Sequence, residues 1–459
     1  MGTGPKKVLF VTYSFPPDAE VGGKRTARFC RFLPEFGIEP LVLTIEERFY
    51  EALDRSYTAP PGLEVIRTGA VSNPLDIYRR WAIRRRARLP KSTPVKVTNA
   101  AARSANGTEA PSVSSLKSNL LLALQTPDRF WGWYWHAVAR GTRLVRERNI
   151  QAIVSSAQPW TSHLVARAIR RKTGVPWIAD FRDAWTLDPW WSLRSTWLDS
   201  CNKRLQAKVV HDADRVVCIA DAMADDFRRR YSDAPPGKFL TITNGIEGEI
   251  SPPEPLPPHE PRILFHLGSL YGDRRLENLF RAVIKLIKDG DVRPGSWKLL
   301  FVGLIDDQIL LRARDEIAYL QQQGMLEIRD RIPFDEGQKA LRSADILLLV
   351  QGDHPYAMPA KFYEYLVTGR PILVLAKGGT LARLVEEIGV GVSVDVDHVD
   401  DIAAGLMKAL RLLALTPSVY ERMIQRFNFR ELSRQLANLI EELTTAADCG
   451  MERLPELTR

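Results

Sequence analysis

Two charged residues three positions apart, Lys361 and Glu364, lie in the stretch MPAKFYEYLVTGRPILVLA at residues 358–376. The start of a helix carries unpaired backbone N–H groups and a partial positive charge, and both attract phosphate. In a helix that begins near Pro359, Lys361 adds a cation at that end and Glu364 places a carboxylate about one turn further on. Such a carboxylate can accept hydrogen bonds from both hydroxyls of a ribose, which indicates a nucleotide site. The alternative is a surface carboxylate that pairs with a helix neighbour.

The segments around this pair have the pattern of a helix followed by a buried strand. Apolar side chains recur at helical spacing after Lys361, Gly369 and Pro371 end the pattern, and residues 372–376 are all apolar. Short apolar runs alternate with helical periodicity elsewhere too. The predicted strands are 7–12, 39–44, 152–156, 177–180, 215–220, 239–243, 262–267, 297–302, 326–328, 346–350 and 372–375, and the predicted helices include 25–36, 162–172 and 277–287. This alternation predicts an α/β fold with two doubly wound, Rossmann-like parallel sheets.

A proline-rich segment, SPPEPLPPHEP at residues 251–261, separates the two series of strands. It contains too much proline for a central strand or a helix, so we expect a stiff linker. This predicts a first domain over residues 1–245 and a second over residues 246–427. Two such sheets joined by a short linker place a cleft between their facing carboxyl ends, where loops supply the ligand-binding groups.

The composition is that of a globular protein: 459 residues, 45% apolar and 26% charged, enough for two or three domains. The four cysteines (Cys30, Cys201, Cys218 and Cys449) are scattered and form no CxxC pair, which argues against a disulfide framework or a zinc site. The N-terminus lacks a signal-peptide core, and no run reaches the roughly 18 apolar residues of a membrane-spanning helix. We expect a cytoplasmic protein, or one on the cytosolic side of a membrane.

The net charge of +9 is concentrated between Arg79 and Arg148, around a basic insertion near residues 80–125. Trp131, Trp133 and Trp135 follow this insertion closely. One interpretation is attachment to an anionic membrane surface, and the other is a solvated loop beside tryptophans that belong to the core. Nucleic acid is not an expected partner, because no nucleic-acid-binding module accompanies the charge.

The stretch PAKFYEYLVTGRPILVLA resembles the donor-site segment of glycosyltransferase family 4, large retaining enzymes of the GT-B fold. VTYSFPPDAEVGGKRTARF is similar to the family's first strand and glycine loop, ITNGIEG to its interdomain turn, and HLGSLYGDRRLENLFRAV to the start of its nucleotide-binding domain. PWIADFRDAWTL resembles a segment common in bacterial members. The helix at 428–443 resembles one that crosses back to the first domain. Residues 428–459 are therefore expected to form a C-terminal helix that returns to the first domain, followed by a tail. The resemblance covers most of the chain except the basic insertion.

In the second domain, the resemblance implies a phosphate site at the loop 268–275, which directly follows a strand. Arg274 matches the family's phosphate lysine, Ser269 stands in place of its arginine, and Arg275 is expected to compensate. With Lys361, these cations would neutralise the charge that develops on the leaving diphosphate. Two solvated arginines at a helix start are the alternative. Donor contacts are also expected from Gly268, Glu364, Gly379 and Thr380.

In the first domain, Gly22 and Gly23 open a helix and would let the backbone approach a bound donor closely, although an ordinary turn is the alternative. The charged residues of the segment 180–183 follow a strand and must face the cleft, solvent or one another. Arg182 occupies the place of a family histidine, and Asp183 is expected to orient the acceptor hydroxyl. An Asp–Arg pair that braces the loop is the alternative. His163 is another acceptor-side candidate, with a structural role as the alternative.

One position departs from the family pattern: Tyr356 stands where a first glutamate usually stabilises the sugar or the developing charge. Asp353 or His354 would then take that role. The resemblance implies front-face transfer, which needs no protein nucleophile, and neither a metal ion nor a cofactor is expected, since the nucleotide sugar is a substrate.

The expected function is hexosyl transfer from a nucleotide-sugar donor to a saccharide or lipid-linked acceptor, in cell-surface polysaccharide or glycolipid synthesis. Two alternatives remain. One is a nucleotide-sugar epimerase or a phosphorylase-like GT-B enzyme, and the other is a non-catalytic nucleotide-sugar-binding protein, which the missing glutamate favours.

Overall fold

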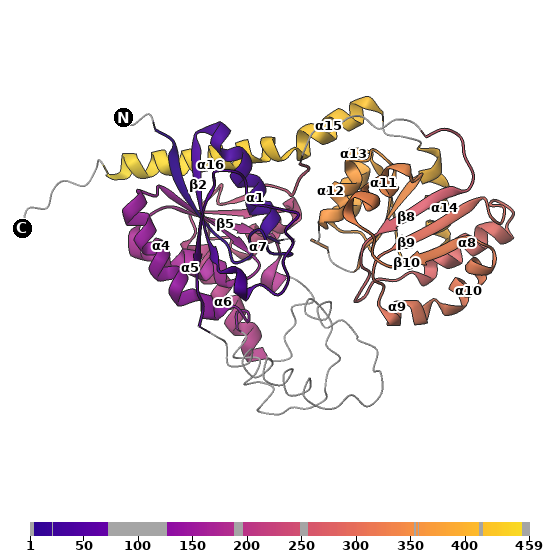
Figure 1. The fold of residues 1–459 in the computed structure, drawn as a ribbon, viewed down its shortest axis with the longest axis horizontal. Helices are drawn as coiled ribbons and strands as arrows, with labels where there is room; N and C mark the ends of the chain where they lie inside the picture. Colours follow the sequence, from indigo (N-terminus) through magenta and orange to yellow (C-terminus); the bar gives the residue numbers. More distant parts are fainter. Residues whose placement is uncertain are drawn as a thin grey trace, which may run out of the picture. The chain divides into compact units, whose positions relative to one another are not determined.

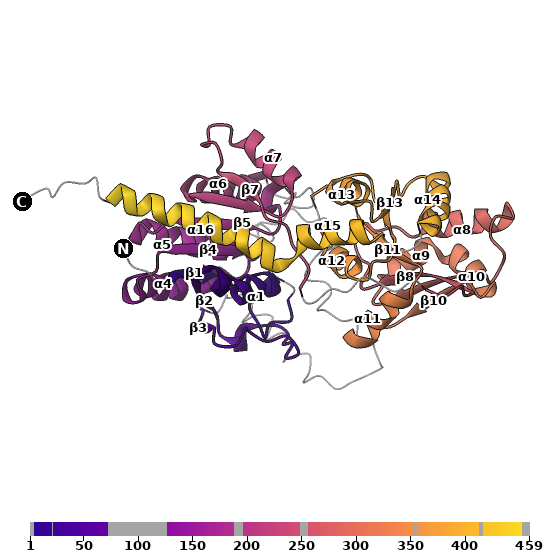
Figure 2. The ribbon, with the colours of Figure 1, turned by 90° about the horizontal axis from the view of Figure 1, so that it is seen from above.

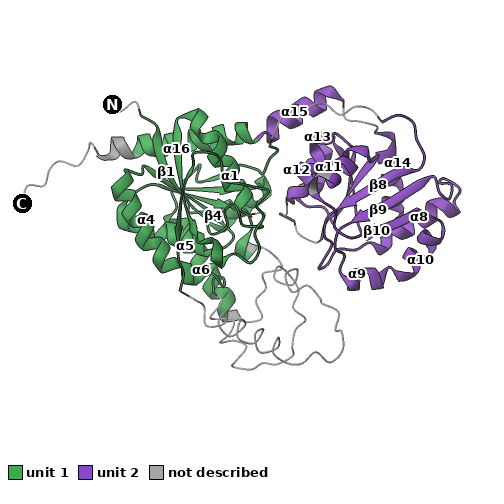
Figure 3. Cartoon of the chain, viewed as in Figure 1, with its two compact units in different colours: residues 1–98, 110–247, 429–459 green, residues 99–109, 248–428 purple. Residues whose placement is uncertain are grey.

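The computed structural model of the chain describes residues 4–20, 22–71, 126–187, 196–247, 256–352, 355–356, 358–412 and 416–451 (Figure 1). The basic insertion predicted near 80–125 and the first part of the proline-rich segment lie outside these ranges. The chain divides into two compact units (Figure 3). Unit 1 comprises residues 1–98, 110–247 and 429–459, and unit 2 comprises residues 99–109 and 248–428.

Unit 1 is built on a parallel sheet whose seven described strands follow the order β3-β2-β1-β4-β5-β6-β7. The strands are β1 (Lys6–Val11), β2 (Ile38–Ile45), β3 (Glu64–Thr68), β4 (Ala152–Ala157), β5 (Trp177–Phe181), β6 (Arg215–Cys218) and β7 (Phe239–Thr241). The helices are α1 (Gly22–Phe32), α4 (Tyr134–Arg148), α5 (Thr161–Thr173), α6 (Thr196–Asp212), α7 (Asp221–Arg230) and α16 (Phe429–Met451). Figure 1 shows α4, α5 and α6 on one face of the sheet and α1 and α16 on the other.

Unit 2 repeats this plan with six described parallel strands in the order β10-β9-β8-β11-β12-β13. The strands are β8 (Arg262–Leu267), β9 (Trp297–Val302), β10 (Leu326–Arg329), β11 (Ile346–Val350), β12 (Ile372–Leu375) and β13 (Gly391–Val394). The helices are α8 (Glu277–Lys288), α9 (Asp307–Arg312), α10 (Arg314–Gln322), α11 (Phe334–Ser343), α12 (Ala360–Leu366), α13 (Thr380–Ile388), α14 (Val399–Arg411) and α15 (Pro417–Phe427). The predicted class of two doubly wound parallel sheets is therefore confirmed.

The differences from the predicted elements lie at the edges of the sheets and at helix ends. The edge strands β3 and β13 were not predicted, because β3 carries polar residues and β13 is short and begins with a glycine. The helix expected at 25–36 begins earlier, at Gly22, and ends at Phe32, after which Leu33–Phe36 forms a 3-10 turn that contains Pro34. Proline is tolerated at the start of such a turn but interrupts a continuing helix.

The long helix α16 belongs to unit 1, although it follows unit 2 in the sequence. Its first residue is anchored to the segment that leaves unit 1, because the Phe429 N–H donates to the Ile246 carbonyl at 2.9 Å. The Phe429 ring packs against Phe29 of α1, with the ring centres 5.2 Å apart. Figure 2 shows α16 extending across unit 1, where it packs against α1. Among the described residues, no helix combines the length and the apolar character needed to cross a bilayer.

Candidate functional site

The candidate site of unit 2 lies where its strand order reverses. From β8 the chain moves outward through β9 and β10, then returns to place β11 on the other side of β8. The loops that leave β8 and β11 at their carboxyl ends therefore diverge, and the place where they part is the usual ligand site of such sheets. Gly268 directly follows β8, Gly352 follows β11 closely, and α12 with Lys361 and Glu364 comes next in the chain.

Gly268 is favoured at the start of this loop by its backbone conformation, and the Lys361 side chain lies against it. The φ of Gly268, +123°, is a conformation that other residues rarely adopt, and a Cβ atom there would lie 2.1 Å from Nζ of Lys361. The lysine side chain therefore lies directly against the backbone of the loop, where Nζ donates to the Ser269 carbonyl at 3.4 Å. The sequence prediction placed Gly268 and Lys361 in one site, and the structure brings them together.

Two arginines join Lys361 around this loop. Arg274 donates through Nε to the Val350 carbonyl at 3.3 Å and through Nη1 to the Tyr271 carbonyl at 3.0 Å. Arg331 donates to the Ser269 hydroxyl at 3.4 Å. Burial together with the nearby Arg274 lowers the pKa of Lys361 to about 8; Glu364 opposes this shift and Arg331 adds to it. Cations gathered around one loop, of which Lys361 has a lowered pKa, are arranged to receive an anion.

Beside the loop is a pocket of about 270 Å³ that contains Glu364. The residues that line it are Leu267, Gly268, Val302, Gly303, Arg331, Ile332, Pro333, Gly337, Gln338 and Glu364. Its walls are mainly apolar, with one carboxylate, one guanidinium and one amide among them. Such a lining suits a flat heterocycle joined to hydroxyl-bearing and anionic groups.

Sequence reasoning missed two members of this site, Arg331 and His266. Arg331 follows β10 closely, and a basic residue just after a strand was the signal available for it. His266 lies on β8, where it is buried and its Nδ1 donates to the Leu348 carbonyl at 2.8 Å. Burial and the neighbouring charge of Lys361 lower the pKa of His266 to about 3, so this ring is neutral. It adds no charge to the site.

Three other residues predicted to bind the donor have protein partners. Arg275, expected to compensate for Ser269, binds the Asp397 carboxylate at 2.5 Å. Thr380 donates to the Pro355 carbonyl through its N–H at 2.9 Å and through its hydroxyl at 3.0 Å. Gly379 precedes α13 with a φ of +94°, and a Cβ there would lie 3.2 Å from Pro355. Asp353 and His354, suggested in place of the first glutamate, lie outside the described residues.

The predicted residues of the first domain meet at the carboxyl edge of the unit 1 sheet. Arg182 follows β5 and donates through Nε to the Ala157 carbonyl at 3.1 Å and through Nη2 to the Gln158 carbonyl at 2.8 Å. Its guanidinium lies against Gly22, where a Cβ would be 2.5 Å from Nη2. Gly23 packs on the backbone of Phe15. Gly22 is therefore a place of close approach, and half-buried Asp183 lies next along the chain.

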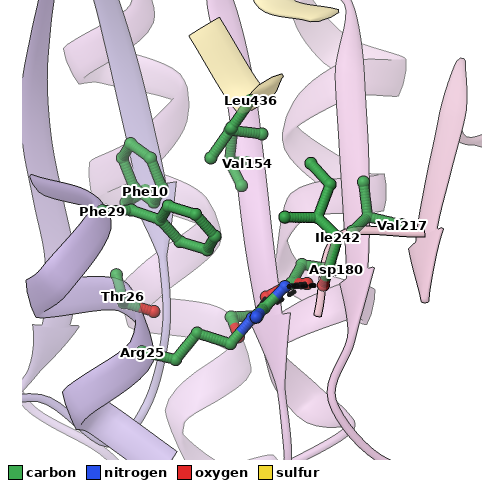
Figure 4. Close-up of a pocket in the computed structure, with 10 residues that line it drawn as sticks. Phe10, Arg25, Thr26, Phe29, Val154, Asp180, Val217, Ile242 and Leu436 are labelled. Atoms are coloured by element: carbon green, nitrogen blue, oxygen red, sulfur yellow. Dashed lines mark hydrogen bonds and ion pairs between the residues drawn. The ribbon is translucent and has the colours of Figure 1, made fainter. Parts of the chain in front are cut away.

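A buried ion pair supports this edge, and it differs from the Asp–Arg pair considered within 180–183. Asp180 pairs with Arg25 of α1, whose Nη2 and Nε donate to the carboxylate at 2.8 and 3.0 Å (Figure 4). The same guanidinium donates to the carbonyls of Ile242 and Thr243 at 2.8 and 2.6 Å. The void beside the pair measures about 10 Å³, too small for a ligand. Asp180 therefore has a structural role.

The structure places His163 in the core, not on the acceptor side as predicted. Its side chain is completely buried, its Nδ1 lies 2.8 Å from the Ser155 hydroxyl, and its ring packs on Phe181 with centres 4.5 Å apart. Burial lowers the pKa of His163 to about 3. This environment favours the structural alternative, because an enclosed imidazole cannot exchange a proton with an acceptor hydroxyl.

The described ranges contain no group of three or more His, Cys, Asp or Glu residues that could hold a metal ion. The cationic side chains around the loop after β8 include Arg274, Lys361 and Arg331.

Comparison with solved structures places this architecture among two-sheet glycosyltransferases of the GT-B type. The chain matches a sucrose-phosphate synthase from Thermosynechococcus elongatus with a TM-score of 0.61 at 16% identity, over 96% of this chain and 100% of that one. It matches HepE from Anabaena with a TM-score of 0.56 at 13% identity, over 95% and 99% of the two chains. It matches the lipopolysaccharide outer core galactosyltransferase WaaB with the same TM-score, identity and coverage. The predicted GT-B fold is therefore confirmed.

The sequence family agrees with the fold. Residues 22–245 match the family model described as a glycosyl transferase 4-like domain. This match, together with the fold, confirms the resemblance and the class of enzyme predicted from the sequence. A search of curated proteins finds no match.

Proposed function

We propose that the protein transfers a hexosyl group from a nucleotide-sugar donor to an acceptor hydroxyl, with retention of configuration. The observation that carries this proposal is the grouping of Lys361, Arg274 and Arg331 around the loop after β8, beside a pocket that contains Glu364. The cations suit a diphosphate, the carboxylate suits a ribose, and the apolar walls suit a base.

In this proposal the protein acts mainly through electrostatics. As the bond between sugar and diphosphate breaks, negative charge grows on the leaving phosphate oxygen, and positioned cations stabilise that charge. Arg274 is held for this task by two backbone carbonyls, so little of its side-chain freedom remains to be lost. Retention then follows from front-face attack, with the departing phosphate accepting the proton of the acceptor hydroxyl. The residues of the described site supply no nucleophile to this scheme.

The relatives suggest which donors to test first. HepE has been solved with UDP and with UDP-glucose, and WaaB is named as a galactosyltransferase. We infer a uridine-linked hexose as the first donor to examine. The proposed acceptor is a saccharide or a lipid-linked saccharide, as in cell-surface polysaccharide or glycolipid synthesis, and the proposed location is cytoplasmic, at the inner face of a membrane.

One observation keeps a second candidate function in view. Tyr356 occupies the place of the family's first glutamate, and its side chain is half-buried. A protein that binds nucleotide sugars without transferring them would tolerate this change. Release of nucleoside diphosphate distinguishes the candidates: a transferase releases it only with an acceptor present, an epimerase interconverts the donor without release, and a binding protein does neither.

The experiment that tests the proposal is a thermal-shift panel of nucleoside diphosphates and their hexose conjugates with the full chain. A ligand that binds only the folded state raises the melting temperature by linkage. We expect one base to give a clear rise in melting temperature, and the corresponding nucleoside monophosphate, added to the panel as a control, to give a smaller one. The absence of a shift across the whole panel would contradict the proposal.

Replacing Glu364 with Gln is expected to weaken nucleotide binding without unfolding the protein. Hydrogen bonds to a charged group contribute about 1.5–3 kcal/mol, so the loss corresponds to roughly tenfold or more in affinity. Isothermal titration with the nucleoside diphosphate measures it. The matched control is Glu327→Gln, since Glu327 pairs with Lys298 on the neighbouring strand β9 and with Arg329 on its own strand β10. Equal affinities for the Glu364 variant and the wild type would remove Glu364 from the site.

Diphosphate affinity is expected to fall as the pH rises through about 8. Lys361 has its pKa lowered to about 8 in the free protein, and a bound diphosphate favours the ammonium form and raises that pKa. Below pH 8 Lys361 is already protonated, so the diphosphate affinity is constant. Above pH 8 Lys361 must take up a proton when the diphosphate binds, and this lowers the affinity. The phosphate itself is fully ionised in this range, because its second pKa is about 6.

Affinity measured by titration from pH 7 to pH 9.5 gives this profile, and Lys361→Arg is the matched variant because a guanidinium keeps its charge throughout. A flat wild-type profile, or the same fall in Lys361→Arg, would contradict the role of Lys361. The effect on stability without ligand has the opposite sign. The folded pKa of Lys361 lies below the ordinary value of 10.5, so its burial costs stability at low pH, and this cost disappears as the pH rises from about 8 to 10.5.

A further inference from the structure

Two large tryptophan side chains lie exposed on unit 1. Trp135 is 63% exposed on α4, and Trp197 is 61% exposed on α6. The tryptophan cluster expected from the sequence is divided by the fold, since Trp133 is completely buried and donates to the Thr68 hydroxyl at 2.8 Å. Trp135 therefore does not contribute to the core, and its exposure calls for a different explanation. Tryptophan is characteristic of positions at a membrane–water interface, where its ring lies at the level of the headgroups.

Each exposed tryptophan begins a stripe of exposed residues along its helix. On α4 the stripe is Trp135, Ala139, Arg143 and Arg146, and on α6 it is Trp197, Ser200, Arg204, Lys208 and His211. Spacings of three and four residues place each set on one side of its helix. The two helices thus present the same pattern, an aromatic residue at the N-terminal end followed by basic residues.

The two helices belong to one layer. α5 packs against both α4 and α6, and Figures 1 and 2 both show the three helices in a row. On α4 and α6 together the exposed charged side chains comprise six basic residues and one acidic residue, Glu147. Among these residues Arg143 pairs with Glu147, Arg148 with Glu64 and Lys203 with Asp199, and the exposed charges on the two helices remain predominantly basic. We call this surface the α4–α6 face.

The position of the α4–α6 face relates it to the candidate acceptor residues. A helix that connects parallel strands begins at the carboxyl edge of the sheet and runs back along it, so Trp135 and Trp197, at the starts of their helices, lie at that edge. The same edge carries Gly22 at the start of α1 and Arg182 after β5. The aromatic end of the face is therefore nearest to the groups expected to receive an acceptor.

We infer that the α4–α6 face docks on the surface of an anionic lipid bilayer. Arg143, Arg146, Arg204 and Lys208 would contact lipid phosphates, while Trp135 and Trp197 would enter the headgroup layer. The charge favours anionic lipid, and the exposed rings favour a bilayer over a purely ionic polyanion such as nucleic acid. The docking itself does not depend on the proposed function. Only one consequence rests on it, namely that a lipid-linked acceptor would then reach the carboxyl edge of unit 1.

The test is sedimentation of the full chain with vesicles of phosphatidylcholine alone and of phosphatidylcholine mixed with phosphatidylglycerol. We expect binding only to the mixed vesicles, and weakening with salt because the Debye length falls from about 10 Å at 0.1 M to about 3 Å at 1 M. Arg143→Gln, Arg146→Gln, Arg204→Gln and Lys208→Gln combined should lower the partition coefficient about tenfold or more. Trp135→Gln with Trp197→Gln should lower it with the charge unchanged.

The matched control removes the same charge from exposed positions on unit 2, with Lys288→Gln, Arg314→Gln, Lys339→Gln and Lys408→Gln combined, and should bind as the wild type does. Equal binding by the α4–α6 charge variant, equal binding to neutral vesicles, or no vesicle binding would overturn the inference. The inference would also be overturned if the wild-type chain bound duplex DNA but not vesicles, and the α4–α6 charge variant lost the DNA binding. Nucleotide-induced thermal shifts in every variant show whether the donor site is intact, so a failure of docking and a failure of the proposed function are told apart.

Discussion

Replacing Arg274 with Ala is expected to lower turnover by about 100-fold while the protein remains folded. Groups positioned to stabilise developing charge commonly contribute factors of about 100 to 1000 in rate. Arg274 has the features of such a group: its guanidinium is oriented by the Val350 and Tyr271 carbonyls and lies over the Tyr271 ring, 4.3 Å from the ring centre. Release of nucleoside diphosphate with donor and acceptor present measures the effect, and binding of the diphosphate product should weaken too.

The neighbouring residue provides the control for this prediction. Arg275→Ala removes the same kind of side chain one position further on, where it binds Asp397, a carboxylate that Lys377 also contacts. We expect turnover close to that of the wild type in this variant. The reverse outcome is a normal turnover for Arg274→Ala and a large loss of turnover for Arg275→Ala. It would contradict the role of Arg274 and assign the phosphate contact to Arg275.

Replacing Asp180 with Ala is expected to lower the free energy of unfolding by about 3–5 kcal/mol, because it leaves the buried charge of Arg25 without its partner. Arg25 is almost completely enclosed, and the void beside it is too small to admit a solvating shell of water. The backbone carbonyls of Ile242 and Thr243 would still accept hydrogen bonds, but they do not neutralise the charge. Urea denaturation followed by circular dichroism measures the change.

Two further variants make the result for Asp180 interpretable. Glu147→Ala breaks an exposed pair with Arg143 on α4 and should leave the unfolding midpoint unchanged, since solvent screens such pairs. Arg25→Met combined with Asp180→Ala removes both charges and should recover part of the loss. Equal stability of the Asp180→Ala and Glu147→Ala variants would contradict the stabilising role of the Arg25–Asp180 pair, which joins α1 to β5.

The order of elements could be predicted because strand and helix patterns are local. Buried parallel strands appear as short apolar runs, and the helices between them repeat apolar residues every three to four positions. β8, β9, β11 and β12 were predicted with the bounds that the structure gives them. The edge strands β3 and β13 were not predicted, because they are exposed or short and their sequences contain little apolar periodicity. The Lys361 and Glu364 site was also accessible, since both residues lie on one short helix.

The sequence by itself determined the alternation of elements, the class of enzyme and the presence of cations in the loop after β8. Only the tertiary structure decided which distant residues meet: Arg331 joins the Lys361 site, Arg25 takes Asp180 as its partner, and His163 enters the core. The same holds for the tryptophans, of which Trp133 is buried and Trp135 is exposed. The physical reason is that these pairings are set by strand order and by the sides on which helices pack. Neither is recorded in the spacing of neighbouring residues, since Arg25 and Asp180 are separated by 155 positions.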